Sequence, residues 1–415
     1  MQRRNFMKFC SAAGLSLFAG RSARAAEGAE APLYACVHAS GGWDPTSLCD
    51  PKGAESAEAE NPMNRYLASD IGQSGTLRWA PIPGAQAFFD KHYKRLLVVN
   101  GIDTATNGHD SGVRHVWSGK LIEGYPAFAA LAAAPHVELP MAFLSSGGYD
   151  HTAGLVAPTR VGHTDVLARL AYPNRPDPKD AERAFHAPHA ASAIDRYRRE
   201  RLLRVKDRVL LPRLVSSVRA FENARSGTSE IQLLSKALPE QLDNGGNPLI
   251  RQSQLAVAAF ESGLAVSANL VIGGFDTHGN HDDSHFPRLG QLMEGVDALW
   301  SLAEARGIAH RLTIIVGSDF GRTPGYNDGN GKDHWSITSM LFLGRGVSGN
   351  RVVGATDERH SPLTVSPSTL ALDPGGVRLT PEHVHVALRK LAAVEGLAAE
   401  GSFGLSTPLT PLLGG

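Results

Sequence analysis

Apolar residues gather along this chain in short runs that are bounded by Gly, Asp or Pro. We predict strands at six of these runs: Leu33–Ala39, Arg95–Asn100, Pro140–Ser145, Ala268–Gly273, Leu312–Gly317 and Ile337–Leu343. Several runs are apolar at nearly every position rather than at every second one. That pattern is typical of strands covered on both faces, as in a parallel sheet.

Helical spacing fills much of the chain between these runs. Apolar residues recur every three or four positions over Pro248–Val266 and Phe286–Arg306, and Pro381–Gly396 is amphipathic. An Arg-rich stretch, Ser192–Ala224, is predicted to form a solvent-facing helix that Pro212 kinks or splits. Strands that alternate with helices predict an α/β fold, doubly wound, with a mostly parallel sheet sandwiched by helices.

The first residues have the pattern of an export signal. RRNFMK starts at position 3, a mild apolar stretch follows over Cys10–Gly20, and ARA at 23–25 is a small-x-small cleavage site. We predict a twin-arginine signal peptide over residues 1–25 and a periplasmic or secreted protein; the alternative is a basic N-terminus of a cytosolic protein. Residues 26–415 are predicted as a single domain, in which about 149–247 form a mostly helical insertion because they interrupt the alternation.

Charge and cysteine content narrow the range of partners. The chain has 41 basic and 41 acidic residues, and without residues 1–25 the balance is 36 to 41. There is no basic field for nucleic acid or anionic lipid, and no later stretch is long and apolar enough for a membrane span. Cys36 and Cys49 either pair in an oxidising compartment or remain buried thiols.

Carboxylates and imidazoles flank several predicted strands. GFDTHGNH at 274–281 follows one strand, SDFGR at 318–322 ends another, and KDHW at 332–335 precedes a third. In an open α/β sheet, sites are built at the carboxyl ends of strands, and Asp with neutral His is a common ligand set for Zn²⁺ and similar ions. An Asp also follows the Gly pair after the first strand. The candidate metal ligands are Asp44, Asp276, His278, Asp319 and His334.

Other polar residues have two readings. Asp44 could instead cap a turn, and Arg322 could hold an anionic oxygen pair or form a structural salt bridge. His109 and Ser111 are candidate catalytic residues at a predicted helix start, or parts of a capped polar turn. The loop Gly325–Gly331 could close over a ligand or could be a surface loop.

Three motifs together carry a family resemblance. GGFDTH, DFGRTP and GKDHW, in this order, resemble the domain-of-unknown-function 1501 family (DUF1501), whose members are bacterial and commonly exported by the twin-arginine route. The resemblance covers nearly all of the chain after the signal, from Cys36 to about Asp357. That family is similar to the alkaline phosphatase and sulfatase superfamily, whose two-metal sites hydrolyse phosphate or sulfate esters. The resemblance implies an alkaline-phosphatase-like fold.

The resemblance also implies roles for individual residues. Asp44 matches a first-strand metal ligand, Asp276 and His278 resemble the Asp/His pair of one metal, Asp319 stands at the other metal, and His334 resembles the late His that completes the first site.

Two positions depart from the superfamily pattern. Phe320 stands where a second-metal His is usual, and Gly108 falls near the expected Ser or Thr nucleophile, for which Thr106 or Ser111 could substitute. Two functions therefore stay open. One is a metal-dependent hydrolase of phosphate or sulfate esters, with Zn²⁺, Mn²⁺ or Ca²⁺ as cofactor. The other is a non-catalytic periplasmic protein that binds a glycan or an envelope protein partner.

Overall fold

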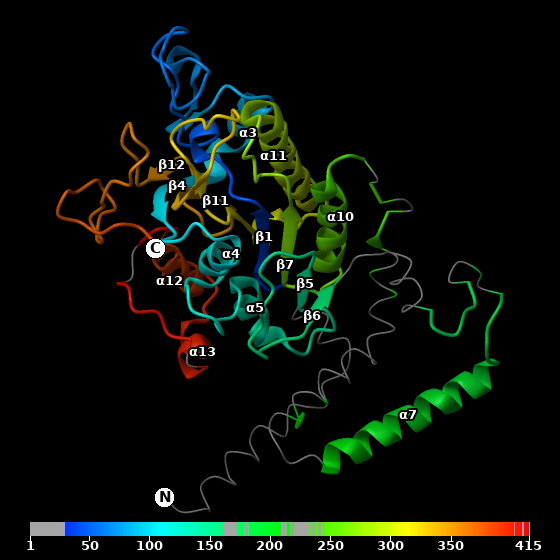
Figure 1. Cartoon of the computed structure of the whole chain (residues 1–415). Coiled ribbons are helices and arrows are strands. Elements are labelled where there is room, and N and C mark those ends of the chain that lie inside the picture. The colour runs from blue at the N-terminus through cyan, green and yellow to red at the C-terminus, as the bar shows by residue number, and fades with distance from the viewer. Residues whose placement is uncertain are drawn as a thin grey trace, which may run out of the picture.

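The computed structural model describes most of the chain after the predicted signal peptide (Figure 1). The described residues are 30–160, 172–177, 180, 182–208, 214–215, 218, 232, 234, 237–239, 242–243, 245–401, 403–408 and 411–414. The predicted signal peptide, residues 1–25, and the predicted kink at Pro212 lie outside them. The division into one domain with an insertion over 149–247 stays a prediction.

An eight-stranded sheet forms the centre of the molecule. Its strands lie in the order β12-β4-β11-β8-β1-β7-β5-β6. Their bounds are β1 Leu33–Ala39, β4 Leu96–Asp103, β5 Phe143–Ser145, β6 Pro158–Arg160, β7 Ser267–Ile272, β8 Leu312–Ser318, β11 Ile337–Gly344 and β12 Arg351–Val353. Two small antiparallel pairs accompany it, β2 Gly72–Ser74 with β3 Leu77–Trp79, and β9 Gly321–Arg322 with β10 His334–Trp335.

The sheet is mixed but mostly parallel. β1 pairs in parallel with β7 and β8, β5 pairs in parallel with β7 and β6, and β12 pairs in parallel with β4. Only β11 runs against its neighbours β4 and β8 in this sheet. The carboxyl ends of β1, β4, β7 and β8 therefore lie at the same edge as the amino end of β11.

Helices cover both faces of the sheet, whereas α7 lies apart from it (Figure 1). The helix bounds are α3 Ala85–His92, α4 His109–Ser118, α5 Phe128–Ala133, α7 Pro188–Arg208, α10 Pro248–Glu261, α11 His281–Ala305, α12 Pro381–Leu391 and α13 Glu395–Glu400. Side chains of α3, α10 and α11 share one buried cluster with Leu33, Ala35 and Val37 of β1. Side chains of α4, α5 and α12 share the opposite cluster with Tyr34 and Cys36.

The predicted α/β fold class is confirmed, and all six predicted strands are present with ends that shift by a few residues. Two elements differ from the prediction. β11 is antiparallel, because the connection from β8 returns through the β9–β10 pair without a crossover helix. α11 begins at His281 rather than Phe286, so that its first two turns carry His281 and His285 into the core, where both are fully buried.

The two cysteines in the described part of the chain are free and buried. Cys36 points into the cluster on the α4 and α5 side of the sheet, whereas Cys49 lies in the cluster on the α10 and α11 side. Burial raises the pKa of both thiols above the ordinary range. Within the described ranges, no helix is both long and apolar enough to cross a membrane.

Candidate metal centre

Strand ends bring four polar side chains to one edge of the sheet. Asp276 and His278 follow β7, and His109 is the first residue of α4, which follows β4. His334 precedes β11, and the antiparallel direction of that strand returns it to the same edge. β10 pairs with β9 so that His334 stands opposite Arg322. Residues from three distant parts of the sequence thus meet at this edge.

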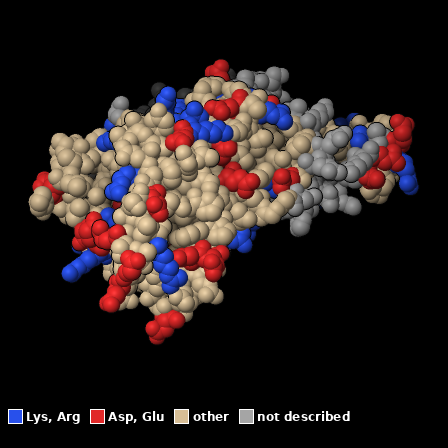
Figure 2. All heavy atoms as spheres, turned by 90° about the horizontal axis from the view of Figure 1, so that it is seen from above, with Lys and Arg blue, Asp and Glu red and all other residues tan. Residues whose placement is uncertain are grey.

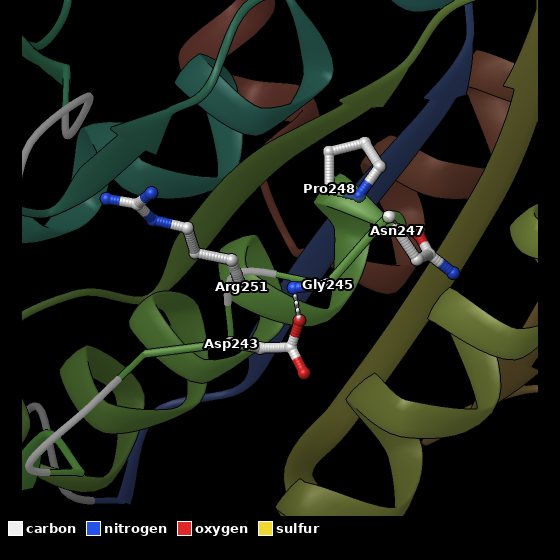
Figure 3. Close-up of a pocket in the computed structure, with 6 residues that line it drawn as sticks. Asp243, Gly245, Asn247, Pro248 and Arg251 are labelled. Carbon is white, nitrogen blue, oxygen red and sulfur yellow. Dashed lines mark hydrogen bonds between the residues drawn. The ribbon is translucent and has the colours of Figure 1, made fainter.

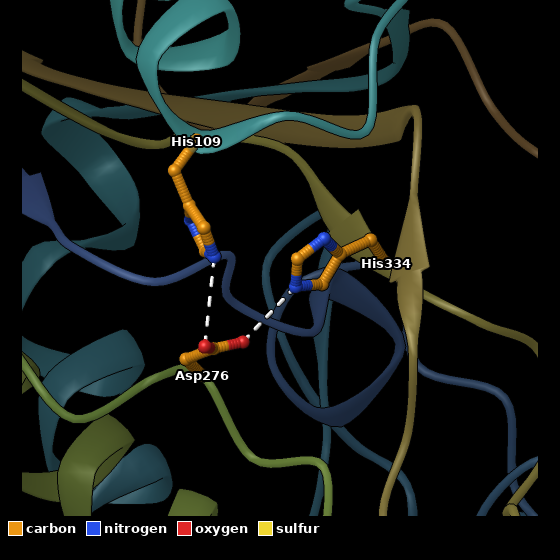
Figure 4. Close-up of side chains that lie close together, drawn as sticks. All are labelled: His109, Asp276 and His334. Carbon is orange, nitrogen blue, oxygen red and sulfur yellow. Dashed lines mark hydrogen bonds and ion pairs between the residues drawn. The ribbon is translucent and has the colours of Figure 1, made fainter.

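Asp276 lies in the middle of this group. Its Oδ1 is 3.0 Å from His278 Nε2 and 3.0 Å from His334 Nε2, and its Oδ2 is 3.5 Å from His109 Nε2. Figure 4 shows the His109 and His334 rings pointing at the carboxylate from two sides. Two ligands of one Zn²⁺ with bonds of about 2.0–2.2 Å lie at most about 4.4 Å apart. The separations around Asp276 fit within that limit.

The other ring nitrogens are held by groups that accept hydrogen bonds. Nδ1 of His334 lies 2.8 Å from the Asn107 carbonyl, and Nδ1 of His278 lies 2.8 Å from Asp333 Oδ1. Nδ1 of His109 lies 2.6 Å from Asp319 Oδ2. A carbonyl or carboxylate oxygen cannot donate, so each Nδ1 carries the proton. In the neutral ring, each Nε2 then has a free lone pair.

The Nε2 atoms of His109 and His334 and an oxygen of Asp276 lie within 4.8 Å of one another, and His278 Nε2 lies 3.0 Å from both Asp276 Oδ1 and His334 Nε2. Such donors repel one another unless a cation lies between them, either protons on the rings or a metal ion. Metal-bound His residues commonly donate their other N–H to a carboxylate or a carbonyl, which fixes the ring. His109, His278 and His334 all have a partner of that kind. The residues present fit a divalent metal.

Asp276 remains ionised in this setting. Burial alone would raise its pKa, but the hydrogen bond from Arg322, and then the adjacent His334 side chain, outweigh burial and lower the pKa to about 2. The Asp276 side chain is 46% exposed and the His278 side chain is 47% exposed, so the centre is open to solvent. The carboxylate is therefore available to a metal and to a molecule that arrives from outside.

Asp319, a predicted metal ligand, lies behind His109. Its carboxylate accepts from His109 Nδ1 on one oxygen, lies 3.1 Å from His38 Nε2 on the other, and accepts from the Gly41 N–H at 3.2 Å. Burial acts to raise the pKa of Asp319, but hydrogen bonds from His38 and His109 lower it overall. In this arrangement Asp319 orients His109.

His38 was not a candidate in the sequence, although it ends the first predicted strand. Its Nδ1 accepts a hydrogen bond from the Trp117 indole N–H at 3.0 Å, which directs the Nε2 proton to Asp319. A line of hydrogen bonds therefore runs from Trp117 through His38 and Asp319 to His109. The sequence did contain a signal for this contact, because His38 and Asp319 both lie at the ends of predicted strands.

Asp44 is placed apart from this group. Its carboxylate is fully buried and lies 2.6 Å from Lys332 Nζ and 3.3 Å from His281 Nε2. The Thr46 N–H and hydroxyl donate to its Oδ1, and Ser47 donates to Oδ2. Asp44 therefore has the turn-capping role that the sequence left open. The buried Lys332, which the sequence did not indicate as a partner, adds an ion pair to that role.

Arg322 and Ser111 also differ from the catalytic roles expected of them. Arg322 is fully buried, and its guanidinium donates to the carbonyls of Gly41, Gly42 and Lys332 and, at 2.7 Å, to Asp276 Oδ1. It positions Asp276 and has no free face for an anion. Ser111 bonds to Thr106 and to the Gly108 carbonyl in the turn that starts α4, which is the capped-turn alternative.

Phe320 forms an apolar wall of the centre. Its ring is fully buried and lies 4.5 Å from the His334 ring and 5.0 Å from the His109 ring, centroid to centroid. The backbone of Gly41 passes close by with a φ of +119°, and a Cβ there would lie 2.5 Å from the Asp276 amide nitrogen. Glycine at this position therefore lets the β1 and β7 loops touch.

The loop Gly325–Gly331 is tied down rather than free to close. His281 N–H donates to the Asn330 carbonyl at 2.8 Å, and the Lys332 N–H donates to Thr277 at 3.0 Å. A Cβ on Gly331 would lie 1.9 Å from the His278 carbonyl carbon, so only glycine permits this approach. The loop thus fixes the segment that carries His278.

Surface features elsewhere are less specific. A pocket of about 260 Å³ opens at the start of α10 between Asp243, Asn247 and Arg251, and none of its lining residues belongs to the His/Asp group (Figure 3). On the face in Figure 2, acidic and basic side chains are interspersed rather than gathered into a field of one sign.

The fold and the site together define an α/β protein with a His/Asp centre at the carboxyl edge of a mostly parallel sheet. The sequence profile described as "Protein of unknown function (DUF1501)" matches residues 34–370. The chain belongs to that family. Among the curated proteins, none matches the sequence.

Solved structures of similar architecture include sulfatases and alkaline phosphatases. The crystal structure of Ps i-CgsB with k-i-k-neocarrahexaose has 8% identity and a TM-score of 0.41, covering 91% of this chain and 75% of that one. Alkaline phosphatase from the Antarctic bacterium TAB5 has 10% identity and a TM-score of 0.39, covering 88% and 98%. Lipoteichoic acid synthase LtaP from Listeria monocytogenes has 7% identity and a TM-score of 0.38, covering 92% and 74%. Likeness at this level carries no argument about chemistry.

Proposed function

We propose that this protein is a metal-dependent hydrolase of an anionic ester, with one divalent metal held by His109, Asp276, His278 and His334. The observation that carries the proposal is the convergence of three Nε2 lone pairs on the Asp276 carboxylate. Imidazole nitrogen suits Zn²⁺ and related transition metals, whereas Ca²⁺ prefers oxygen. Among Zn²⁺, Mn²⁺ and Ca²⁺, the donor set therefore favours Zn²⁺.

Each residue has a defined task in this proposal. A bound divalent metal supplies Lewis acidity toward an ester oxygen and lowers the pKa of a bound water. Asp319, Asp333 and the Asn107 carbonyl hold the three imidazoles by Nδ1, and Arg322 holds Asp276. Phe320 excludes water from one side of the His109 and His334 rings. The open side, where Asp276 and His278 are exposed, receives the ester.

A non-catalytic binding or envelope-assembly protein is the second candidate, and a specific observation favours it. Among the described residues, no Ser or Thr hydroxyl hydrogen-bonds to Asp276, His278 or His334, and Arg322 has no free donor face. Within that part of the chain, no hydroxyl nucleophile is hydrogen-bonded into the centre. This candidate binds a metal, a glycan or a protein partner without hydrolysing an ester.

Metal content and turnover separate the two candidates. Protein purified without added metal is analysed for its elements, together with Asp276→Asn, His334→Ala and the matched control Asp328→Asn, an exposed acid on the neighbouring loop. About one equivalent in wild type and the control, with loss in the other two, supports the metal centre. Metal-dependent cleavage of para-nitrophenyl phosphate or sulfate then supports the hydrolase. A loaded centre that cleaves neither ester favours the binding protein, and a folded protein with no metal refutes the hydrolase and leaves the binding protein.

Export belongs to the same proposal. The RRNFMK segment and the ARA site predict passage through the twin-arginine route, which places the centre outside the cytoplasm. Replacement of Arg3 and Arg4 by Lys should retain the precursor in the cytoplasm. Fractionation followed by immunoblotting measures this, and unchanged distribution contradicts the export prediction.

A further inference from the structure

A lysine side chain occupies the position of a cation next to the centre. Lys332 is fully buried, and its Nζ lies 2.6 Å from Asp44 Oδ2 and 2.7 Å from Asn64 Oδ1. The Tyr326 ring faces the ammonium with its centroid 5.1 Å away. Two oxygens and an aromatic face thus surround a positive charge that the chain itself supplies.

Asp44 is satisfied without a metal. A line of hydrogen bonds starts at its own N–H, which donates to His285 Nε2 at 2.9 Å. The His285 Nδ1 proton then points to Thr277 Oγ1, whose hydroxyl can donate to His281 Nδ1 at 2.7 Å. That leaves a proton on His281 Nε2, which lies 3.3 Å from Asp44 Oδ2 and makes no hydrogen bond within the described part of the chain.

The remaining acceptor capacity of Asp44 is also taken. Oδ1 accepts from the Thr46 N–H at 2.9 Å and the Thr46 hydroxyl at 2.6 Å, and Oδ2 accepts from Ser47 and Lys332. Burial would raise the pKa of Asp44, but Lys332, and then His281, hold it well below its usual range. The carboxylate is therefore charged and fully partnered.

Formal charge is already balanced at Asp44. Its negative charge is paired with the ammonium of Lys332, and Arg322 is a second buried cation in the same region, donating to the Lys332 carbonyl. A second divalent cation would add an uncompensated +2 beside two buried basic groups, at a high electrostatic cost.

We propose that Lys332 replaces a second metal ion at Asp44, so that the centre is mononuclear. This inference rests on the proposed metal centre and specifies it further. Asp44 is not a metal ligand, and the ammonium of Lys332 neutralises its carboxylate instead. A mononuclear centre without a protein nucleophile would have to use water on a small anionic ester.

The test begins with the full chain and Zn²⁺ alone. Metal-free wild type is titrated by calorimetry, and zinc-loaded crystals are examined by anomalous diffraction. One equivalent and one anomalous peak beside Asp276 are expected. Two equivalents with a peak beside Asp44 overturn this inference while the metal centre stands. No binding overturns both proposals. Neither readout depends on a variant that must fold.

Variants examine the replacement itself. Lys332→Met keeps the length of the side chain and removes its charge, so Asp44 is left unpaired. We expect this variant to bind a second equivalent of Zn²⁺ and to gain more thermal stability from Zn²⁺ than wild type does. The double variant Asp44→Asn with Lys332→Met removes both charges and should return to one equivalent. A folded Lys332→Met protein that still binds one equivalent overturns the proposed replacement.

Discussion

The hydrogen bond between Asp319 and His109 allows a quantitative test of how the centre is built. The Asp319 side chain is 2% exposed and accepts hydrogen bonds from His38, His109 and the Gly41 N–H. Asparagine has the same shape, but one of its two terminal groups donates instead of accepting. In Asp319→Asn, an amide N–H would therefore face an imidazole or backbone N–H.

Two effects of this change can be estimated. Loss of an outer partner of a metal-bound His typically lowers metal affinity about 10–100-fold, which corresponds to about 1.4–2.7 kcal/mol of binding free energy. An unsatisfied buried donor costs about 1–3 kcal/mol of folding free energy in addition. Asp333→Asn should lower affinity less, because Asp333 is exposed and water can replace its contact with His278.

The assay is competition for Zn²⁺ against a chromophoric chelator at fixed pH and ionic strength. Wild type, Asp319→Asn, Asp333→Asn and the control Asp328→Asn are compared, and circular dichroism checks that each is folded. The expected order of affinity is wild type equal to the control, then Asp333→Asn, then Asp319→Asn. An Asp319→Asn protein that binds Zn²⁺ within twofold of wild type would refute the orienting role of Asp319.

Three further predictions follow from the same contacts. Arg322→Met should lower the free energy of unfolding by about 3 kcal/mol, as measured by denaturant unfolding. This is the lower end of the range for a broken buried ion pair, because Asp276 is half exposed. A loss under about 1 kcal/mol would contradict the role of Arg322 in holding Asp276. The folded-state pKa of Asp276 is about 2 and that of Asp319 is lowered from the usual 3.8, so the stability that each carboxylate contributes is present above about pH 4 and is lost as pH falls through its folded-state pKa. Acid titration of metal-free protein should show that loss, and a flat profile over this window counts against it. Cys36 and Cys49 should react with a thiol reagent only after denaturation, as mapped by mass spectrometry, because burial raises both pKa values; labelling of the native protein would contradict this.

Local pattern was sufficient to locate the strands and several site residues. β1 spans the predicted Leu33–Ala39, because an uninterrupted apolar run can be buried only in a covered strand. Asp276, His278 and His334 flank strand ends directly, and they meet because strand ends share an edge of the sheet. The sequence could therefore predict that these three side chains lie close together.

The tertiary structure decided the role of the other candidates. Asp44 and Arg322 are paired inside the protein by Lys332 and by backbone carbonyls, which no local pattern identifies. Asp319 can orient His109, which is 210 positions away in the sequence, because α4 begins at the edge of the sheet where β4 ends. The sequence by itself determined where strands and reactive side chains lie along the chain, since hydrophobicity and residue chemistry are local. Which carboxylate faces the histidines, and which faces a lysine, depends on contacts between distant segments, and only the folded chain decides those contacts.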